Sequence, residues 1–328
     1  VLLVRIGYAR SSLIIGCTLL IAVQLLGVLI SRRFRKLKVA IVPSPAIENL
    51  LPRNAKNLEF RTLEKPELGE TRFDGIVVDM DAELGSDWIR FISHCNISGI
   101  PVFNARKVTE TLDGKVNLAT LQSTDLANLQ PQPVYLAAKR AFDIAATLAV
   151  APLLIPVCIV VALLIRLDSP GAAIFVQQRI GKGNTVFRMY KFRSMRPLEE
   201  DNAAPQFADQ DAHRITRLGA FIRKFRIDEL PQFLNVFKGD MSLIGPRPEQ
   251  PGFVEQFENE VPYYSYRHIV RPGITGWAQV NHGYAADTES TKEKVEHDFY
   301  YIKHLSPGLD FLIVIRTLRT IFTGFGAI

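Results

Sequence analysis

The sequence predicts an α/β protein with two segments that contact a membrane. Two uncharged apolar stretches, residues 11–30 and 144–165, interrupt a chain that elsewhere carries evenly spread charge. Between them, short β-branched runs alternate with helical spacing, which is typical of a small Rossmann-like parallel α/β domain. Strand and helix patterns mix after the second stretch and predict an α+β domain. We therefore expect four parts, which are residues 1–37, 38–130, 131–168 and 169–328.

The first apolar stretch predicts an N-terminal transmembrane helix. It is uncharged over about the 20 residues that a spanning helix needs. No small-residue cleavage site follows, so a signal peptide is disfavoured. The basic segment SRRFRKLK comes next and predicts that this end lies in the cytoplasm. Because the chain begins at Val1 rather than Met, we also expect it to be a fragment of a longer protein.

Residues 38–130 predict a small parallel sheet. KVAIV, LEFRTL, GIVVDM and PVFNA are short β-branched runs, and Asp87–Asn96 has helical spacing between the last two. A dinucleotide site would need G-x-G-x-x-G after the first strand, but the sequence there is PSPAIENL. A regulatory or dimerising domain is therefore favoured, and a homodimer is left open.

The second apolar stretch favours a re-entrant helix hairpin over a full span. Pro152 and Pro156 lie in its middle, and an internal proline removes a helix hydrogen bond and causes a kink. Both flanks are basic, whereas a span should have asymmetric flanks. A helix that enters one leaflet, bends and returns accounts for both observations. It would keep residues 166–328 in the cytoplasm.

The composition excludes some classes of partner. The formal net charge of +6 is compatible with nucleic acid, an anionic membrane or a phosphorylated substrate. No zinc-finger spacing, basic region with heptads or RNA-binding sheet signature is present, so we expect no nucleic-acid partner. Cys17, Cys95 and Cys158 have neither metal-ligand spacing nor a disulfide framework.

Adjacent carboxylates in the segment RIDELPQFLNVFKGDMSLIGPRP are the main candidates for chemistry. Asp228 precedes a helical pattern over residues 229–238, with Pro231 in the first turn and Gly239 as a suitable stop. The ordinary interpretation is that Asp228 is a helix N-cap. A helix start is also an anion site, and a carboxylate there should stay ionised as a nucleophile must.

Basic residues gather around this pair in the sequence. Arg223, Lys224 and Arg226 come just before it, and Arg247 follows within GPRP. Cations beside a carboxylate pair can bind phosphate oxygens. Glu229 next to Asp228 can bind Mg²⁺, which prefers oxygen ligands. The pattern therefore predicts a phosphate and Mg²⁺ site.

These motifs resemble the bacterial sugar transferase family. Its members are the polyprenyl-phosphate hexose-1-phosphate transferases, or monotopic phosphoglycosyl transferases, and the upstream layout is similar to its long form. The resemblance starts at Lys139 and covers about 190 residues. It rests on KRAFDIAATL, FVQQRIGKG, FRMYKFRSM, RITRLGAFIRKFRIDELPQFLNVFKGDMSLIGPRP and RPGITGWAQV.

The resemblance implies a reaction and a location. A sugar 1-phosphate would pass from a UDP-sugar to undecaprenyl phosphate through an aspartyl-phosphosugar, with release of UMP, as the first step of exopolysaccharide, capsule or O-antigen synthesis. The location implied is the cytoplasmic face of the bacterial inner membrane, in contact with membrane lipids. Asp228 would be the nucleophile and Glu229 its partner at Mg²⁺. Arg223, Arg247 and Lys191 would bind phosphate.

Two parts of the resemblance are less complete. Pro156 matches the family's helix-breaking proline, but Ile155 stands where many members have Ser. RPGITGWAQV offers Arg271 for substrate binding and Trp277 either for recognition or as a buried turn residue. Likewise, the helical run at residues 309–322 is either a membrane-interface helix or a core helix.

Alternatives to this reaction remain. One is a phosphohydrolase or sugar transferase without a covalent intermediate. Another is a non-catalytic scaffold that binds nucleotide sugars through residues 39–129 in a polysaccharide export complex. The sequence identifies neither the sugar nor the pathway.

Overall fold

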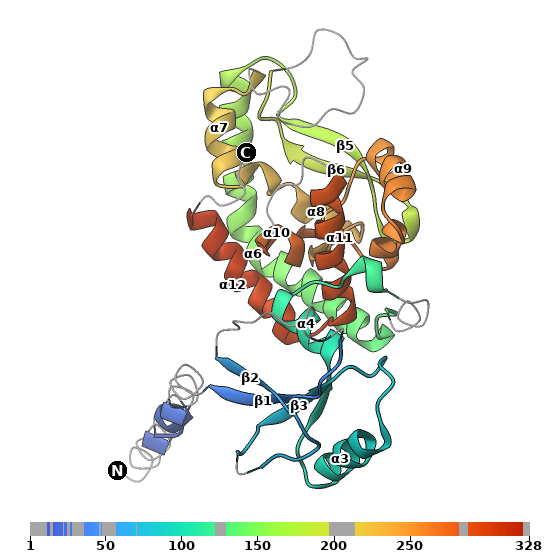
Figure 1. Cartoon of the computed structure of the whole chain (residues 1–328). Coiled ribbons are helices and arrows are strands. Elements are labelled where there is room, and N and C mark those ends of the chain that lie inside the picture. The colour runs from blue at the N-terminus through green and yellow to red at the C-terminus, as the bar shows by residue number, and fades with distance from the viewer. Residues whose placement is uncertain are drawn as a thin grey trace, which may run out of the picture. The chain divides into compact units, whose positions relative to one another are not determined.

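The computed structural model divides into two compact units, Val1–Asp113 and Gly114–Ile328 (Figure 1). Apart from scattered positions between residues 12 and 27, it describes residues 36–121 without 46, 48–56 and 70, and then residues 129–196, 214–281 and 288–323. Most of the predicted transmembrane helix at residues 11–30 therefore lies outside the described residues, although Gly16–Ile21 are helical.

The first unit contains the predicted parallel sheet. Its strands are β1 (Leu37–Ile41), β2 (Leu58–Thr62), β3 (Gly75–Val78) and β4 (Val102–Asn104). They pair in the order β2-β1-β3-β4, and every pair is parallel. Two helices, α3 (Ser86–Ile97) and α4 (Ala105–Asp113), accompany them. The four β-branched runs each form a strand as predicted, and the buried faces of β1 and β3 supply the core of this unit.

The division between the units falls earlier than the predicted boundary at residue 130. Val116, Leu118 and Leu129 are buried in the main hydrophobic cluster of the second unit. Lys115 also pairs with Glu293, and the two charged atoms lie 2.9 Å apart. This segment therefore packs with the second unit.

The second unit combines helices with two small sheets. Its elements are η1 (Leu118–Thr120), α6 (Pro133–Asp168), β5 (Ile174–Ile180), η2 (Lys182–Asn184), β6 (Val186–Phe192), α7 (Arg217–Lys224), η4 (Ile227–Glu229), α8 (Gln232–Lys238), β7 (Ser242–Ile244), α9 (Pro251–Glu260), η5 (Tyr264–Ile269), β8 (Gly273–Thr275), α10 (Trp277–Asn281), α11 (Thr288–Lys303) and α12 (Pro307–Thr323). β5 and β6 pair antiparallel and form a β-hairpin. β7 and β8 pair parallel, and β7 leads into the GPRP loop.

The long helix α6 continues through both prolines, so the predicted hairpin is not seen. Its 36 residues span about 54 Å at 1.5 Å per residue. Each proline removes one backbone donor, and the apolar residues around it continue the helix on both sides. By length and composition, α6 is the one helix among the described residues that is apolar and long enough to cross a membrane.

The two ends of α6 are buried, while its middle is exposed. Asp143 and Thr147 are buried near the start, and Val161 and Ile165 near the end. Between residues 148 and 160 no side chain is buried, although most of these side chains are apolar. Both ends therefore pack against the second unit, and the apolar middle does not.

The C-terminal helix α12 is more exposed than an ordinary core helix. Ile313 is fully buried, but Phe311 is 67% exposed, and Val314, Ile315 and Leu318 are exposed as well. Lys139 of α6 and Asp310 of α12 form a partly buried ion pair at 2.6 Å. The exposed apolar side chains of α12 favour the membrane-interface interpretation of this run.

A close backbone approach holds α7 against the segment after β6. Thr216 donates its backbone N–H to the carbonyl oxygen of Ser194 at 3.2 Å. A Cβ atom on Gly219, in the first turn of α7, would overlap that same oxygen. Only glycine fits there without movement of the helix.

Substitution of this glycine should destabilise the protein. We expect Gly219→Ala to lower the free energy of unfolding by about 1–3 kcal/mol, the usual cost of forcing extra volume into a packed site. The matched control is Gly308→Ala in α12, where a Cβ atom meets nothing within 4 Å. Thermal unfolding in detergent should show a lower Tm for Gly219→Ala and an unchanged or higher Tm for Gly308→Ala. Equal Tm values for the two variants would contradict this packing.

Candidate active site

The two adjacent carboxylates lie in the short 3-10 turn η4 rather than at the start of α8. The N-cap of α8 is Pro231, so Asp228 is not the helix cap that the sequence predicted. Pro231 has no N–H to donate to Ile227 O, which accepts from Leu230 N at 3.1 Å instead. This closes a separate turn before α8 begins. Gly239 ends α8 with a positive φ of 97°, as the sequence predicted.

Glu229 is buried among three cations. Its Oε1 lies 3.0 Å from Arg247 Nη1, 3.6 Å from Arg226 Nη1 and 3.7 Å from Lys191 Nζ. Burial alone would raise the pKa of Glu229, but the charges of Arg247, Lys191 and Arg226 outweigh it and lower this pKa to about 2. Glu229 is therefore ionised at neutral pH and balances the cations around it.

Asp228 lies in a different environment although it is the next residue. Burial and the negative charge of Glu229 raise its pKa to about 6, and Lys191, Arg247 and Arg223 offset this only in part. A carboxyl group with this pKa is about nine-tenths ionised at pH 7. Its Oδ1 atom is buried and accepts no hydrogen bond from the described part of the chain. Asp228 thus has an ionised oxygen that none of the described residues engages.

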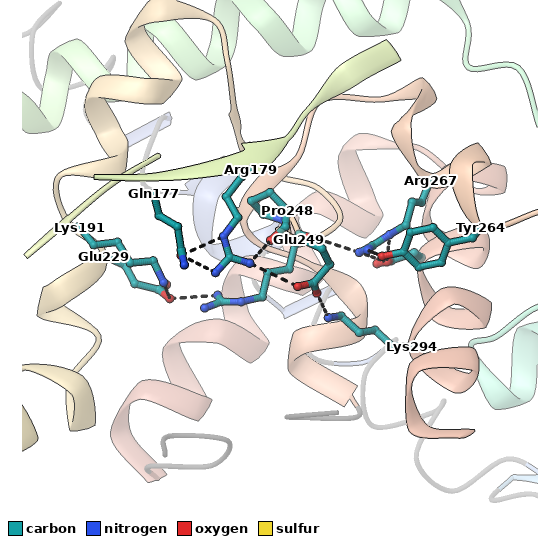
Figure 2. A network of polar contacts seen from close by, with 11 residues as sticks. Gln177, Arg179, Lys191, Glu229, Pro248, Glu249, Tyr264, Arg267 and Lys294 are labelled. Carbon is teal, nitrogen blue, oxygen red and sulfur yellow. Dashed lines mark hydrogen bonds and ion pairs between the residues drawn. The ribbon is translucent and has the colours of Figure 1, made fainter. Parts of the chain in front are cut away.

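Lys191 reaches the pair from the end of β6 (Figure 2). Burial lowers the pKa of its ammonium group to about 8, Arg247 adds to this effect, and Glu229 opposes it. Lys191 therefore remains mostly protonated at neutral pH but loses its charge within a mildly basic range. Its Nζ lies 3.7 Å from Glu229 Oε1, and the predicted binding of phosphate by Lys191 stays a prediction.

Arg223 reaches the site from the last turn of α7. Its Nε donates to Ser194 Oγ at 2.8 Å, and its charge lowers the pKa of Asp228. Three of the predicted phosphate-binding residues, Arg223, Lys191 and Arg247, therefore act electrostatically on Asp228. The contact from Ser194 was not predicted, because a serine in FRSM carries no signal of its partner.

Arg271 is the predicted site residue that the structure does not bring to the carboxylates. Its Nε donates to Gly239 O at 3.0 Å, at the far end of α8. It lines a small cavity with Lys139, Arg140 and Ser242. The neighbouring Trp277 is buried, stacks on Tyr300 and donates to Gly114 O, as expected of a packed turn residue.

The carboxylates form a small donor set for a metal ion. The described residues contain no group of three or more His, Cys, Asp and Glu side chains that could hold a metal. Mg²⁺ commonly binds through one or two carboxylates, substrate phosphates and waters, so a full protein cage is not required. The unengaged Oδ1 of Asp228 fits this mode. Glu229 faces three cations and is the less available of the two.

Comparison with known proteins identifies the family. The model of the bacterial sugar transferases matches residues 134–324, more than half of the chain. The chain belongs to the bacterial sugar transferase family. The resemblance found in the sequence motifs is confirmed, and this sugar transferase is an enzyme of the transferase class.

Three relatives illustrate the match. UDP-N-acetylgalactosamine-undecaprenyl-phosphate N-acetylgalactosaminephosphotransferase of Aeromonas hydrophila is 52% identical over 299 residues, which are 91% of this chain and 70% of the relative. UDP-glucose:undecaprenyl-phosphate glucose-1-phosphate transferase of Escherichia coli is 42% identical over 190 residues, 57% of this chain and 40% of the relative. Exopolysaccharide production protein PSS of Rhizobium leguminosarum is 42% identical over 187 residues, 55% of this chain and 92% of the relative.

The site of this sugar transferase predicts a bell-shaped dependence of activity on pH. An attacking Asp228 must be deprotonated, so kcat/KM should fall as the pH drops through about 6. A phosphate-binding Lys191 must be protonated, so kcat/KM should also fall as the pH rises through about 8. Initial rates between pH 5 and 9 at constant ionic strength would measure both limbs. A profile that is flat from pH 5 to 7 would contradict the raised pKa of Asp228.

Proposed function

We propose that this sugar transferase moves a sugar 1-phosphate from a UDP-sugar to undecaprenyl phosphate through a covalent intermediate on Asp228. UMP is released, and the lipid-linked product starts synthesis of an exopolysaccharide, capsule or O-antigen. The observation that carries the proposal is the contrast between the two carboxylates. Glu229 is held by three cations, whereas the ionised Asp228 keeps an oxygen that no described residue engages.

The proposed reaction consists of two displacements at one phosphorus atom. Asp228 attacks the phosphorus that bears the sugar, the bond from that phosphorus to the bridging oxygen breaks, and UMP leaves with that oxygen. An oxygen of undecaprenyl phosphate then attacks the same phosphorus and releases Asp228. A carboxylate nucleophile divides one difficult step into two easier ones. The two displacements together need neither an oxidant nor a reductant.

The cations around the carboxylates support the handling of phosphate. Arg247 and Arg223 offer planar forks that can each bind two phosphate oxygens, and Lys191 adds a point charge. We propose that Asp228 and Glu229 hold Mg²⁺ together with the phosphates of the donor. When bound, Mg²⁺ would neutralise charge that develops on the phosphate oxygens.

The donor we propose is UDP-N-acetylgalactosamine. The Aeromonas relative, whose name specifies that sugar, aligns with 91% of this chain at 52% identity. The Escherichia coli relative, whose name specifies glucose, aligns with 57% at 42% identity. The longer and closer match favours the first donor, with UDP-glucose as the comparison substrate.

We also propose that the apolar middle of α6 lies in the cytoplasmic leaflet of the bacterial inner membrane and that α6 does not cross the bilayer. Its buried ends both pack on the second unit, and its exposed apolar middle lies between them. Arg193 donates to Ser169 O at 2.7 Å and Pro170 O at 2.8 Å, which fixes the end of α6 next to β6. An unbroken helix with both ends on one unit is expected to lie along the membrane face on the side of that unit rather than to cross the bilayer.

A reconstituted assay tests the proposed reaction. Purified protein in detergent, with Mg²⁺ and undecaprenyl phosphate, is incubated with UDP-N-acetylgalactosamine or UDP-glucose, and UMP is measured. We expect UMP release with the first donor, dependent on the lipid and abolished by EDTA. UMP release with neither donor from folded protein would contradict the proposal and favour the non-catalytic scaffold. Release that is independent of lipid would favour a phosphohydrolase.

A further inference from the structure

The direction of Arg247 depends on a loop rather than on a helix or strand. Arg247 lies between β7 and α9, in a segment without regular secondary structure. Its guanidinium donates to Glu229 Oε1 at 3.0 Å, the shortest of the three cation contacts of that carboxylate. The side chain of a loop residue keeps a fixed direction only if other contacts hold its backbone.

A buried arginine supplies such a contact. Arg267 is the largest fully buried side chain in the described part of the chain. Its Nη2 donates to the backbone carbonyl of Arg247 at 2.8 Å. The same guanidinium makes two bonds to Asp298 Oδ2, at 2.7 and 3.1 Å, and a third to Tyr264 Oη at 2.7 Å. These four bonds use four of the five N–H groups that an arginine side chain offers.

The residues after Arg247 are also held by cations (Figure 2). Arg179 of β5 donates to Pro248 O at 3.1 Å and lies 3.4 Å from a Glu249 carboxylate oxygen. Lys294 of α11 pairs with the other carboxylate oxygen of Glu249. Cations from η5, β5 and α11 therefore fix three consecutive loop residues.

Stability alone does not account for the Arg267–Asp298 pair. Both side chains are only 1% exposed, and such pairs are often replaced by apolar residues at no cost in stability, because desolvation offsets their attraction. What an apolar residue would lose is the hydrogen bond to the backbone of Arg247. The pair therefore matters for the placement of the loop that carries Arg247.

We propose that Arg267, oriented by Asp298, is a positioning residue that aims Arg247 at Glu229 and at the phosphates of the donor. The inference rests on the proposed function, in which Arg247 binds phosphate. Loss of Arg267 would leave Arg247 present but misdirected, and displacements of about 1 Å can cost on the order of 100-fold in rate.

A double-mutant cycle between Arg267→Lys and Arg247→Ala tests this inference. The lysine keeps the charge and loses the fork that reaches Arg247 O. Transfer of radiolabelled sugar into the lipid phase is measured as kcat and KM, normalised to the folded fraction from circular dichroism. We expect Arg267→Lys to lower kcat by about 10- to 100-fold in the wild-type background. In the Arg247→Ala background, where no side chain remains to be aimed, the same change should matter less than about twofold.

Controls separate positioning from a loss of folding. Asp310→Asn disrupts the partly buried Lys139–Asp310 pair on α6 and α12. It should lower Tm, and its effect on kcat should be the same in both backgrounds. If Arg267→Lys does not fold, Asp298→Asn takes its place in the cycle, because it is isosteric and weakens the orientation of Arg267.

The outcomes distinguish the inference from the function on which it rests. Equal fold losses for Arg267→Lys in both backgrounds, in a wild-type protein that transfers sugar, would overturn the positioning role alone. Absence of transfer by the wild type would overturn the proposed function first.

Discussion

Asp228→Asn should lower the rate of UMP release by at least about 1,000-fold, which corresponds to about 4 kcal/mol in activation free energy. The amide has nearly the same shape as the carboxylate but cannot act as the nucleophile. The fold should be preserved, because Asp228 Oδ1 makes no hydrogen bond with the described residues. Removal of a carboxylate that burial penalises should leave Tm unchanged or slightly higher.

Asp87→Asn is the matched control for this variant. Asp87 lies in the first turn of α3, so the same chemical change is made in the unit that does not contain Asp228. UMP release, measured at saturating donor and lipid, should be normal in Asp87→Asn. A rate within tenfold of wild type for Asp228→Asn would show that another group is the nucleophile.

Glu229→Gln should have the second largest effect, a loss of about 100- to 1,000-fold in kcat. The amide leaves the charges of Arg247, Arg226 and Lys191 without the carboxylate that balances them. These cations would then attract Asp228 and make it a weaker nucleophile. Glu229 also raises the pKa of Asp228, so its neutralisation should lower that pKa. The acid limb of the pH profile should therefore move below about 6.

The pH profile of kcat/KM measures this second effect independently of the rate. The control is Glu293→Gln on α11, which removes a carboxylate that pairs with Lys115. The acid limb of this variant should stay at the wild-type position. An acid limb of Glu229→Gln that moves to higher pH would contradict the assigned electrostatics.

Local patterns were sufficient to predict much of the fold. The four β-branched runs of residues 38–130 each became a strand. Proline effects were harder to predict because they depend on neighbouring hydrogen bonds. Pro231 delays the start of α8, while Pro152 and Pro156 do not interrupt α6.

The candidate site could be predicted only in part. Asp228, Glu229 and their cations were found because they stand close together in recognisable motifs. The Arg267–Asp298 pair was missed because the two residues are 31 positions apart and neither carries a signal of its partner. Arg271 stands in a motif of the family, but its backbone places its side chain at the far end of α8.

The most direct test of the central claim is the mass of the protein during turnover. Protein mixed with UDP-N-acetylgalactosamine and Mg²⁺, without undecaprenyl phosphate, is quenched and measured by intact mass spectrometry. The account predicts a gain of one phospho-N-acetylhexosamine group, mapped to the peptide that contains Asp228 and discharged when undecaprenyl phosphate is added. Sugar transfer to the lipid with no such adduct at any quench time, or an adduct that persists in Asp228→Asn, would contradict it.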